Sequence, residues 1–139
     1  MRILLVENDQ AVAKFLVAAL QGCHDDWEVE VMASPQEAVE HVATTTGLSY
    51  NLLIADYDLG DPKCNGFQLV ALLLSDDRMR QSLTRFIPYR AIIMSGLFPE
   101  DFHARMAQAW ANGVSLLPLQ KPVKLSVLEA LITCVMALP

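Results

Sequence analysis

Short apolar runs alternate with longer, mixed stretches along the whole chain. We expect strands at residues 3–6, 28–32, 52–55, 91–94 and 116–119. Apolar runs this short that stop at a polar residue are typical of strands buried on both faces of a parallel sheet. We expect helices in the intervening stretches, at residues 11–20, 35–42, 67–74, 99–111 and 125–137. The alternation of strands and helices predicts an α/β fold.

The second expected helix has a clear start signal. Ser34 supplies a capping hydroxyl, Pro35 occupies the first turn, and Glu37 follows the cap by three residues. These residue types at these positions favour the start of a helix. Between residues 75 and 90 the pattern gives no clear element.

Five strand–helix units with right-handed crossovers leave few arrangements of the sheet. One of the commonest is the flavodoxin-like (βα)5 fold, with five parallel strands in the order 2-1-3-4-5 and helices on both faces. A chain of 139 residues, 53% of them hydrophobic, suits one such domain with one core. We therefore expect a single domain over residues 1–139, with no output domain.

Polar residues follow four of the five apolar runs. They are Glu7, Asn8 and Asp9, then Asp56 and Asp58, then Ser95, and finally Lys121. In an open α/β sheet the carboxyl ends of the strands form the edge where ligands bind, and the order 2-1-3-4-5 makes the first and third strands neighbours. Carboxylates, a hydroxyl and an ammonium at one edge predict a phosphoryl-transfer site, in which Asp56 attacks phosphorus while Mg²⁺ and Lys121 neutralise charge.

Composition narrows the class of partner. The net charge of -6 argues against direct binding of nucleic acid, which depends on Lys and Arg neutralising phosphates. The three cysteines are odd in number and widely spaced, and no secretory leader precedes the first strand, which favours reduced thiols in the cytoplasm. No apolar run approaches the roughly 18 residues of a membrane span. We expect a soluble cytoplasmic protein with a protein partner or a small phosphodonor.

The polar residues at the ends of these four strands occur in the order found in a known family. Residues 1–138 resemble the receiver domain of two-component response regulators, the CheY-like family. The resemblance implies that Asp56 is the phosphoacceptor, that Ser95 contacts the phosphoryl group, and that Lys121 is the ion-pair partner. Pro122 follows Lys121 as in the Lys-Pro pair of the family. The implied partner is a histidine kinase or a histidine phosphotransfer protein.

The resemblance also implies a Mg²⁺ site. Its expected ligands are Glu7, Asn8, Asp56 and Asp58, the last through its backbone carbonyl. Asn65-Gly66 stands where the family usually has Asp-Gly before the third helix.

The chain departs from the family pattern at three places. The second acid after the first strand is replaced by Asn8, so we expect weaker Mg²⁺ binding; Asn8 can still coordinate through its amide oxygen, and Asp9 can help if its loop bends. The family's proline after the acceptor is replaced by Gly60, with a short insertion at residues 61–64, which predicts a more flexible loop. Pro118 replaces the expected aromatic switch residue, so coupling by an aromatic rotamer is not expected.

Two alternatives remain open. In the first, Asp56 and Lys121 form a structural ion pair in a receiver-like binding module that signals without phosphorylation. In the second, Asp56-Tyr57-Asp58 is the Asp-x-Asp motif of a haloacid-dehalogenase-like phosphatase. That family needs a later acidic pair for its metal, whereas Glu129 is the only acid after Lys121. We therefore expect phosphotransfer to the chain itself rather than enzymatic turnover.

The first and fifth expected helices, at 11–20 and 125–137, are apolar nearly all round. In the order 2-1-3-4-5 they share one face of the sheet, so their outer sides can join into an exposed apolar patch. We expect this patch to serve homodimerisation or the docking of a kinase or phosphotransfer helix, with tight alanine-rich packing as the alternative. His24, His41 and His103 are scattered, and we assign them no site.

Overall fold

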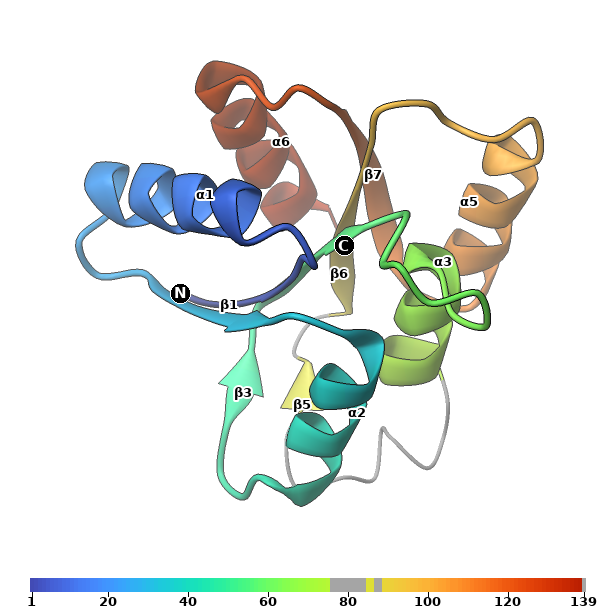
Figure 1. The fold of residues 1–139 in the computed structure, drawn as a ribbon, viewed down its shortest axis with the longest axis horizontal. Helices are drawn as coiled ribbons and strands as arrows, with labels where there is room; N and C mark the ends of the chain where they lie inside the picture. The colour runs from blue at the N-terminus through green and yellow to red at the C-terminus, as the bar shows by residue number, and fades with distance from the viewer. Residues whose placement is uncertain (76–84, 87–88, 139) are drawn as a thin grey trace.

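Five parallel strands form the central sheet in the computed structural model, which describes residues 1–75, 85–86 and 89–138 (Figure 1). The strand order is β2-β1-β4-β6-β7. Their bounds are β1 Arg2–Val6, β2 Glu28–Met32, β4 Leu52–Asp56, β6 Arg90–Ser95 and β7 Ser115–Gln120. Counted in chain order within this sheet, the sequence is 2-1-3-4-5, so the flavodoxin-like prediction is confirmed.

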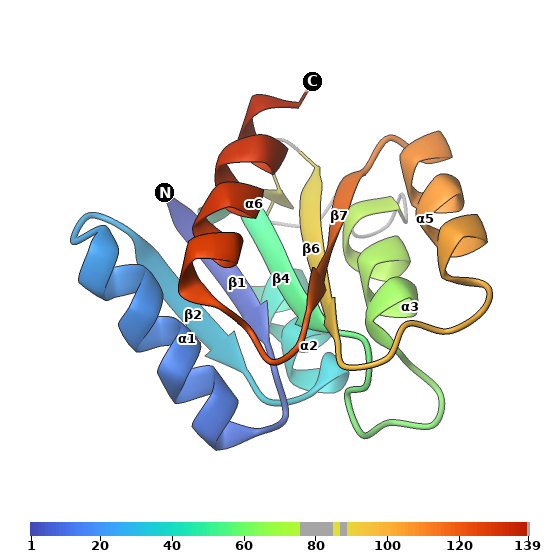
Figure 2. The same ribbon diagram turned by 90° about the horizontal axis from the view of Figure 1, so that it is seen from above.

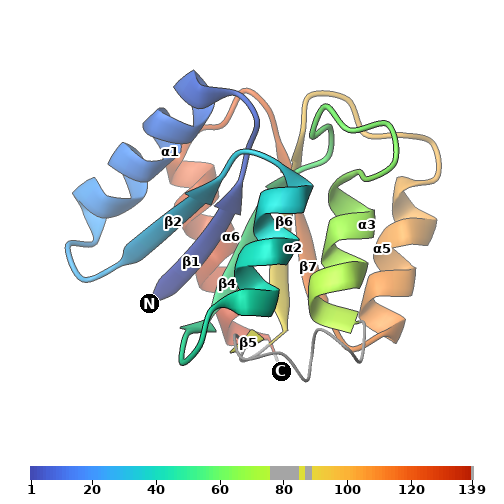
Figure 3. The same ribbon diagram turned by 60° about the horizontal axis from the view of Figure 1, so that its bottom comes forward.

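Helices cover both faces of the sheet. Their bounds are α1 Gln10–Cys23, α2 Pro35–Thr44, α3 Gly66–Val70, α5 Phe102–Ala111 and α6 Leu125–Ala137. Figure 2 shows α1 and α6 together on one face, and Figure 3 shows α2, α3 and α5 in front of the other. The Ser34 hydroxyl accepts a hydrogen bond from the Glu37 backbone N–H, as expected of a cap.

Two apolar cores lie on either side of the sheet, because successive side chains of a strand point to opposite faces. Leu4 and Val6 of β1 belong to the core beneath α2, α3 and α5. Ile3 and Leu5 of the same strand belong to the core beneath α1 and α6. All four side chains are fully buried, which explains why the run is apolar without interruption.

The structure adds elements that the sequence pattern did not predict. A second, two-stranded parallel sheet pairs β3 (Ser49–Tyr50) with β5 (Arg85–Phe86), and β5 lies in the stretch that gave no clear element. The third helix continues beyond Val70 as a π-helix, η1 (Ala71–Ser75). Helix α5 begins at Phe102 rather than at residue 99, because the Phe102 N–H closes a turn on the Pro99 carbonyl.

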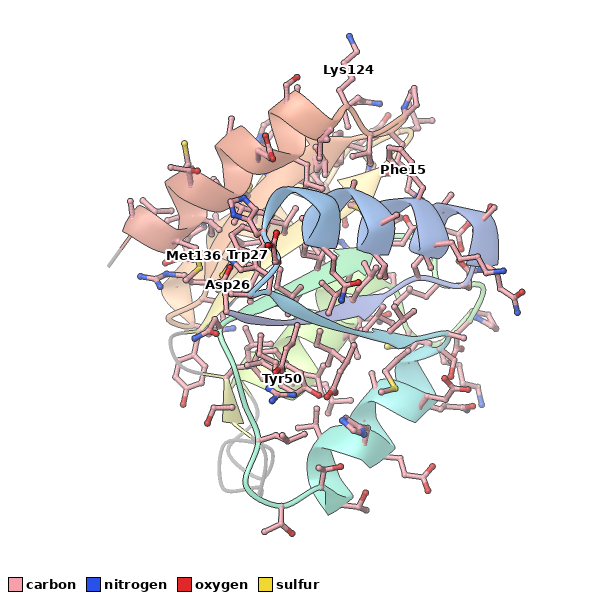
Figure 4. All side chains as sticks on the ribbon, turned by 90° about the vertical axis from the view of Figure 1, so that its left-hand side faces the viewer. Phe15, Asp26, Trp27, Tyr50, Lys124 and Met136 are labelled. Carbon is pink, nitrogen blue, oxygen red and sulfur yellow. The ribbon has the colours of Figure 1, made fainter. Side chains whose placement is uncertain are left out.

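The outer sides of α1 and α6 are partly apolar, as predicted. Phe15 on α1 is 51% exposed and Val127 on α6 is 44% exposed. Figure 4 shows Phe15 on α1 and Lys124 at the start of α6. No helix in the described part of the chain has both the length and the apolar character needed to cross a membrane.

Candidate functional site

The carboxyl ends of four strands meet at one edge of the sheet (Figure 2). Asp56 is the last residue of β4 and Ser95 is the last residue of β6. Glu7 follows β1 directly, and Lys121 follows β7. Strand β4 lies between β1 and β6, so the topology brings side chains from distant parts of the sequence to a common edge.

Lys121 joins two carboxylates at this edge. Its Nζ donates to Asp56 Oδ2 at 2.7 Å and to Glu7 Oε2 at 3.0 Å. The Glu7 side chain is fully buried and that of Asp56 is 10% exposed, whereas Lys121 keeps 22% of its side chain in contact with solvent. The structure therefore holds two buried carboxylates around one ammonium.

Burial and pairing act in opposite directions on these groups. Burial alone would lower the pKa of Lys121, but its hydrogen bonds to Asp56 and Glu7 outweigh burial and raise it. The pKa of Glu7 is raised, mainly because burial disfavours its charged form, although Asp9 and Lys121 donate to it. The ammonium of Lys121 is thus held in its charged state beside Asp56.

Ser95 lies at the site, but its hydroxyl is bonded within its own loop. Ser95 is buried, and its Oγ donates to the Leu97 carbonyl at 2.8 Å. The same Oγ accepts a hydrogen bond from the Leu97 N–H at 3.2 Å. A phosphoryl group on Asp56 would have to compete with Leu97 for this hydroxyl.

The remaining acids after β1 and β4 serve the local backbone. Asp9 caps α1, since its Oδ1 accepts from the N–H groups of Ala11 and Val12. The Asp58 Oδ1 accepts from the Gly60 N–H at 3.0 Å. The Asp9 carboxylate would have to give up its cap before it could assist a metal ion.

Gly60 is required by the geometry of the loop after β4. Its φ is +72°, a conformation that proline cannot adopt, and its N–H is used by Asp58. A Cβ at this position would lie 3.0 Å from the amide nitrogen of Asn8. The replacement of the family's proline therefore follows from the path of this loop and the position of Asn8.

The inserted residues form a closed turn. Asp61 and Cys64 pair as an isolated antiparallel bridge, and the Lys63 N–H donates to Asp61 Oδ1 at 2.8 Å. Pro62 occupies the position in the turn where its fixed φ is favourable. Asp61 also lines the pocket beside Asp56, which the sequence pattern did not predict.

Gly66 lies directly against the end of β4. A Cβ at Gly66 would come within 2.5 Å of the Asp56 carbonyl oxygen, so no larger residue fits without movement of the backbone. Its N–H donates to the Tyr57 carbonyl at 2.9 Å. The preceding Asn65 forms a reciprocal capping box with Gln68. The Asn65-Gly66 pair thus fixes the start of α3 against the end of β4.

A pocket of about 420 Å³ opens at this edge. Its lining residues are Asp56, Tyr57, Asp58, Leu59, Asp61, Asn65, Ser95, Gly96, Leu97 and Lys121. Leu97 is 86% exposed at its rim. The pocket places the Asp56 carboxylate, the Lys121 ammonium and the Ser95 side chain within one solvent-accessible space.

Three of the expected Mg²⁺ ligands are oxygen donors at the ends of β1 and β4. The Glu7 and Asp56 carboxylates share Lys121, and the side chain of Asn8 lies against Gly60. Within the described residues, no three His, Cys, Asp or Glu side chains come together as a metal site. A Mg²⁺ ion here would be completed by an amide, a backbone carbonyl and water, which matches its usual habit of keeping several waters.

A polar cluster at the opposite end of the sheet was not predicted. Tyr50 donates its hydroxyl to Glu30, and His41 Nε2 lies 3.0 Å from Glu30 Oε2 and 2.9 Å from the Tyr50 hydroxyl. Arg2 binds the other Glu30 oxygen at 3.0 Å. Burial and the neighbouring Glu30 raise the pKa of Tyr50. The sequence assigns His41 no site, and the structure gives it two partners, the half-buried Glu30 and the fully buried Tyr50.

The only sequence signal for this cluster was the alternation of glutamate and valine in β2. Glu28 and Glu30 both bind Arg2, whose two Nη atoms lie 2.6 Å and 3.0 Å from them. Because alternate residues of a strand share a face, these acids lie on the same side of the sheet. Nothing local in the sequence indicated that Tyr50 or His41 would join them.

No family model and no curated protein matches the chain. Solved structures with closely similar folds include the non-phosphorylated HemR receiver domain from Leptospira biflexa, with a TM-score of 0.70 at 20% identity, covering 99% of this chain and 95% of that one. A CheY-like receiver domain from Methanospirillum hungatei has a TM-score of 0.69 at 20% identity, covering 97% and 92%.

A third similar structure is the receiver domain of a sensor histidine kinase from Pseudomonas aeruginosa. Its TM-score is 0.66 at 18% identity, over 99% of this chain and 98% of that one, and it carries a magnesium ion in its active-site cleft. The agreement extends over nearly the full length of both chains in all three cases. The chain therefore has the fold of the CheY-like receiver domains of response regulators, as its sequence resemblance implied.

Proposed function

We propose that this chain is a phosphoacceptor receiver domain of a two-component phosphorelay. Asp56 takes a phosphoryl group from the phosphohistidine of a histidine kinase or phosphotransfer protein. The observation that carries the proposal is the placement of Lys121 between Asp56 and Glu7, at 2.7 Å and 3.0 Å, at the carboxyl edge of the sheet. The receiver fold of the structural neighbours supports it.

The transfer needs little covalent machinery from the protein. An oxygen of the Asp56 carboxylate forms the new P–O bond while the bond from phosphorus to the donor's imidazole nitrogen breaks, and that nitrogen keeps the electron pair. Lys121 lies beside Asp56 and neutralises part of the charge on the phosphoryl oxygens. The Ser95 hydroxyl leaves Leu97 and donates to a phosphoryl oxygen, which moves its loop and changes the surface of the protein.

Mg²⁺ is the proposed cofactor. Glu7, Asn8, Asp56 and the backbone carbonyl of Asp58 would hold it, and it would supply additional positive charge at the phosphoryl oxygens. Asn8 contributes no charge, and Asp9 is engaged as a helix cap. A unit charge pair at about 4 Å and an effective dielectric near 20 is worth about 4 kcal/mol before desolvation. Mg²⁺ should therefore bind more weakly than at a site with two acids after β1.

The second candidate is a receiver-like module that signals by binding alone. It is favoured by the same neutral Asn8 and by the ion pairs that already satisfy Asp56 and Glu7. A phosphatase is the third class, and the turnover of a phosphomonoester would support it. The structural neighbours are receiver domains, which are signalling modules.

Intact mass measured after incubation with acetyl phosphate over a Mg²⁺ titration separates the candidates. A single-phosphate adduct that requires Mg²⁺ and is absent from Asp56→Ala supports the phosphoacceptor. Its half-saturating Mg²⁺ concentration should fall in Asn8→Asp, since a charged ligand is restored. If wild-type protein gives no adduct at any Mg²⁺ concentration and Asn8→Asp does, the binding module is the better proposal.

The exposed apolar surface of α1 and α6 is the proposed docking surface for the kinase, the phosphotransfer protein or a second copy of the chain. Phe15 and Val127 are its large exposed apolar residues. Light scattering at high protein concentration tests the second copy, and a monomer there argues against a homodimer. Binding of a phosphotransfer protein that survives in Phe15→Ser together with Val127→Ser would argue against this surface altogether.

A further inference from the structure

The side chain of Gln120 connects the two loops that carry Ser95 and Lys121. Gln120 is the last residue of β7, and its Nε2 donates to the Gly96 carbonyl at 2.7 Å. The same nitrogen donates to the Lys121 carbonyl at 3.1 Å. One amide group therefore links the backbone just after β6 to the backbone just after β7.

This link begins where the sheet's own hydrogen bonds stop. The Lys121 N–H donates to the Ser95 carbonyl at 2.9 Å, which closes the β6–β7 ladder at the site. The next carbonyl along the loop belongs to Gly96, and it is bound by a side chain rather than by a strand. Movement of the Ser95 loop toward Asp56 thus has to strain or break the bond to Gln120.

The Ser95 hydroxyl is held in the same resting arrangement. It donates to the Leu97 carbonyl and accepts from the Leu97 N–H, so residues 95–97 close on themselves. To reach a phosphoryl group on Asp56, the hydroxyl must release both groups of Leu97, which frees the Gly96–Leu97 peptide group to move. Gln120 binds the carbonyl of that peptide group.

Gly96 has no steric need to be glycine in this arrangement. Its φ lies outside the left-handed region, and a Cβ there would have no heavy atom within 4 Å. Gly66 differs, because a Cβ there would collide with the backbone of Asp56. A glycine that the resting loop does not require leaves the peptide free to rotate when the loop moves.

Pro118 stands where the resemblance implies an aromatic switch residue and has no aromatic ring, whereas the amide of Gln120 binds the loop directly. We infer that Gln120 is a positioning residue that tethers the Ser95 loop in its resting position and releases it when Ser95 turns to a phosphoryl group on Asp56. The inference rests on the proposed phosphoacceptor function. One polar side chain, that of Gln120, then couples the β6–α5 loop to the β7–α6 segment.

Two variants remove the tether at nearly constant size. Gln120→Leu has no hydrogen-bond donor. In Gln120→Glu an ionised carboxylate, which can only accept hydrogen bonds, would face the carbonyl oxygens of Gly96 and Lys121. The matched control is Gln108→Leu, which removes an exposed glutamine of α5 whose amide donates to Asn112 at 3.4 Å. Each protein is assayed for hydrogen exchange of the Leu97 amide without phosphodonor, and for the rate of Asp56 phosphorylation by acetyl phosphate at fixed Mg²⁺.

Both Gln120 variants should exchange the Leu97 amide faster and accept phosphate faster than wild type. The expected change is about threefold to tenfold, the ratio that the net strength of a neutral hydrogen bond allows. The melting temperature should match that of the control, because Gln120 is exposed and contributes little to the core.

Unchanged Leu97 exchange in both variants would overturn the inference, as would slower phosphorylation. If wild type gives no adduct on Asp56, the proposed function fails, and the exchange measurement still decides whether Gln120 tethers the loop. The failure of the tether and the failure of the phosphoacceptor thus give different results.

Discussion

At the residue scale, the site is a balance of two carboxylates against one ammonium. Glu7 and Asp56 each carry one negative charge when ionised, and Lys121 carries one positive charge. Of the two carboxylates, Asp56 lines the pocket, where an incoming cation can reach it. The same arrangement makes Lys121 essential, because without it two nearly buried carboxylates would face each other.

Lys121→Met should therefore lower the free energy of unfolding by about 3 kcal/mol, because it leaves two buried acids without a counter-charge. Urea unfolding at pH 7 in metal-free buffer measures this loss. Lys124→Met is the control, since Lys124 is exposed and makes no side-chain cap bond to α6. A loss no larger than that of the control would show that the carboxylates are stabilised by other means.

The raised pKa of Glu7 predicts a specific pH dependence. Because the folded state holds the Glu7 proton to higher pH than the unfolded chain, whose value is near 4.5, the folded state binds more protons in that window. Stability then falls as the pH rises from 4.5 through the folded pKa. The unfolding free energy of wild type, measured in EDTA, should therefore fall relative to that of Glu7→Gln over this range. A rise of wild type relative to Glu7→Gln with pH would mean that pairing with Lys121 outweighs burial.

At the element scale, the sequence pattern predicted the strands and helices that bury continuous apolar faces. The run at residues 52–55 is buried on both faces of the sheet between β1 and β6. Its strand could therefore be predicted from the uninterrupted apolar run alone. The two-residue strands β3 and β5 are too short to show a period of two. Their pairing joins segments far apart in the sequence, which a local pattern does not contain.

The sequence predicts those features of the site that depend only on where the strands end. The positions of Asp56, Ser95 and Lys121 follow from the strand order, but the directions of their hydroxyl and carboxylate groups do not. Asp9 and Asp58 bind nearby backbone N–H groups, an option open to any short polar side chain. From the sequence alone, these carboxylates could bind either a metal ion or the local backbone. Only the three-dimensional contacts show which groups they bind.

The junction between β4 and α3 gives a prediction about packing. Gly66→Ala would ordinarily favour the helix, yet its Cβ would lie 2.5 Å from the Asp56 carbonyl oxygen. We expect a loss of about 2 kcal/mol in unfolding free energy, because the strand end and the helix start must separate. Gly96→Ala is the matched control and should stay within about 0.5 kcal/mol, since nothing lies within 4 Å of its Cβ. Equal effects at the two glycines would contradict the close approach at Gly66.

At the scale of the whole molecule, reactive and structural polar groups occupy opposite ends of one sheet. The carboxyl edge carries Asp56 and Lys121 beside an open pocket. The amino end carries the cluster of Arg2, Glu30 and Tyr50, whose groups are satisfied by one another. Figure 4 shows Tyr50 on the α2 side of the sheet. The two groups of polar residues thus lie apart in the described structure.

Tyr50→Phe tests that separation. The variant keeps the aromatic stacking on Phe86, whose ring centroid lies 5.2 Å away, but removes the hydroxyl that donates to Glu30 and contacts His41. Glu30 would keep Arg2 and His41, so we expect a loss of about 1–3 kcal/mol rather than unfolding. The rate of Asp56 phosphorylation by acetyl phosphate should stay within about twofold of wild type, since no bond of the site depends on Tyr50. A stable variant with slower phosphorylation would instead show that the two ends of the sheet are coupled. The polar cluster around Glu30 would then take part in the phosphorylation of Asp56.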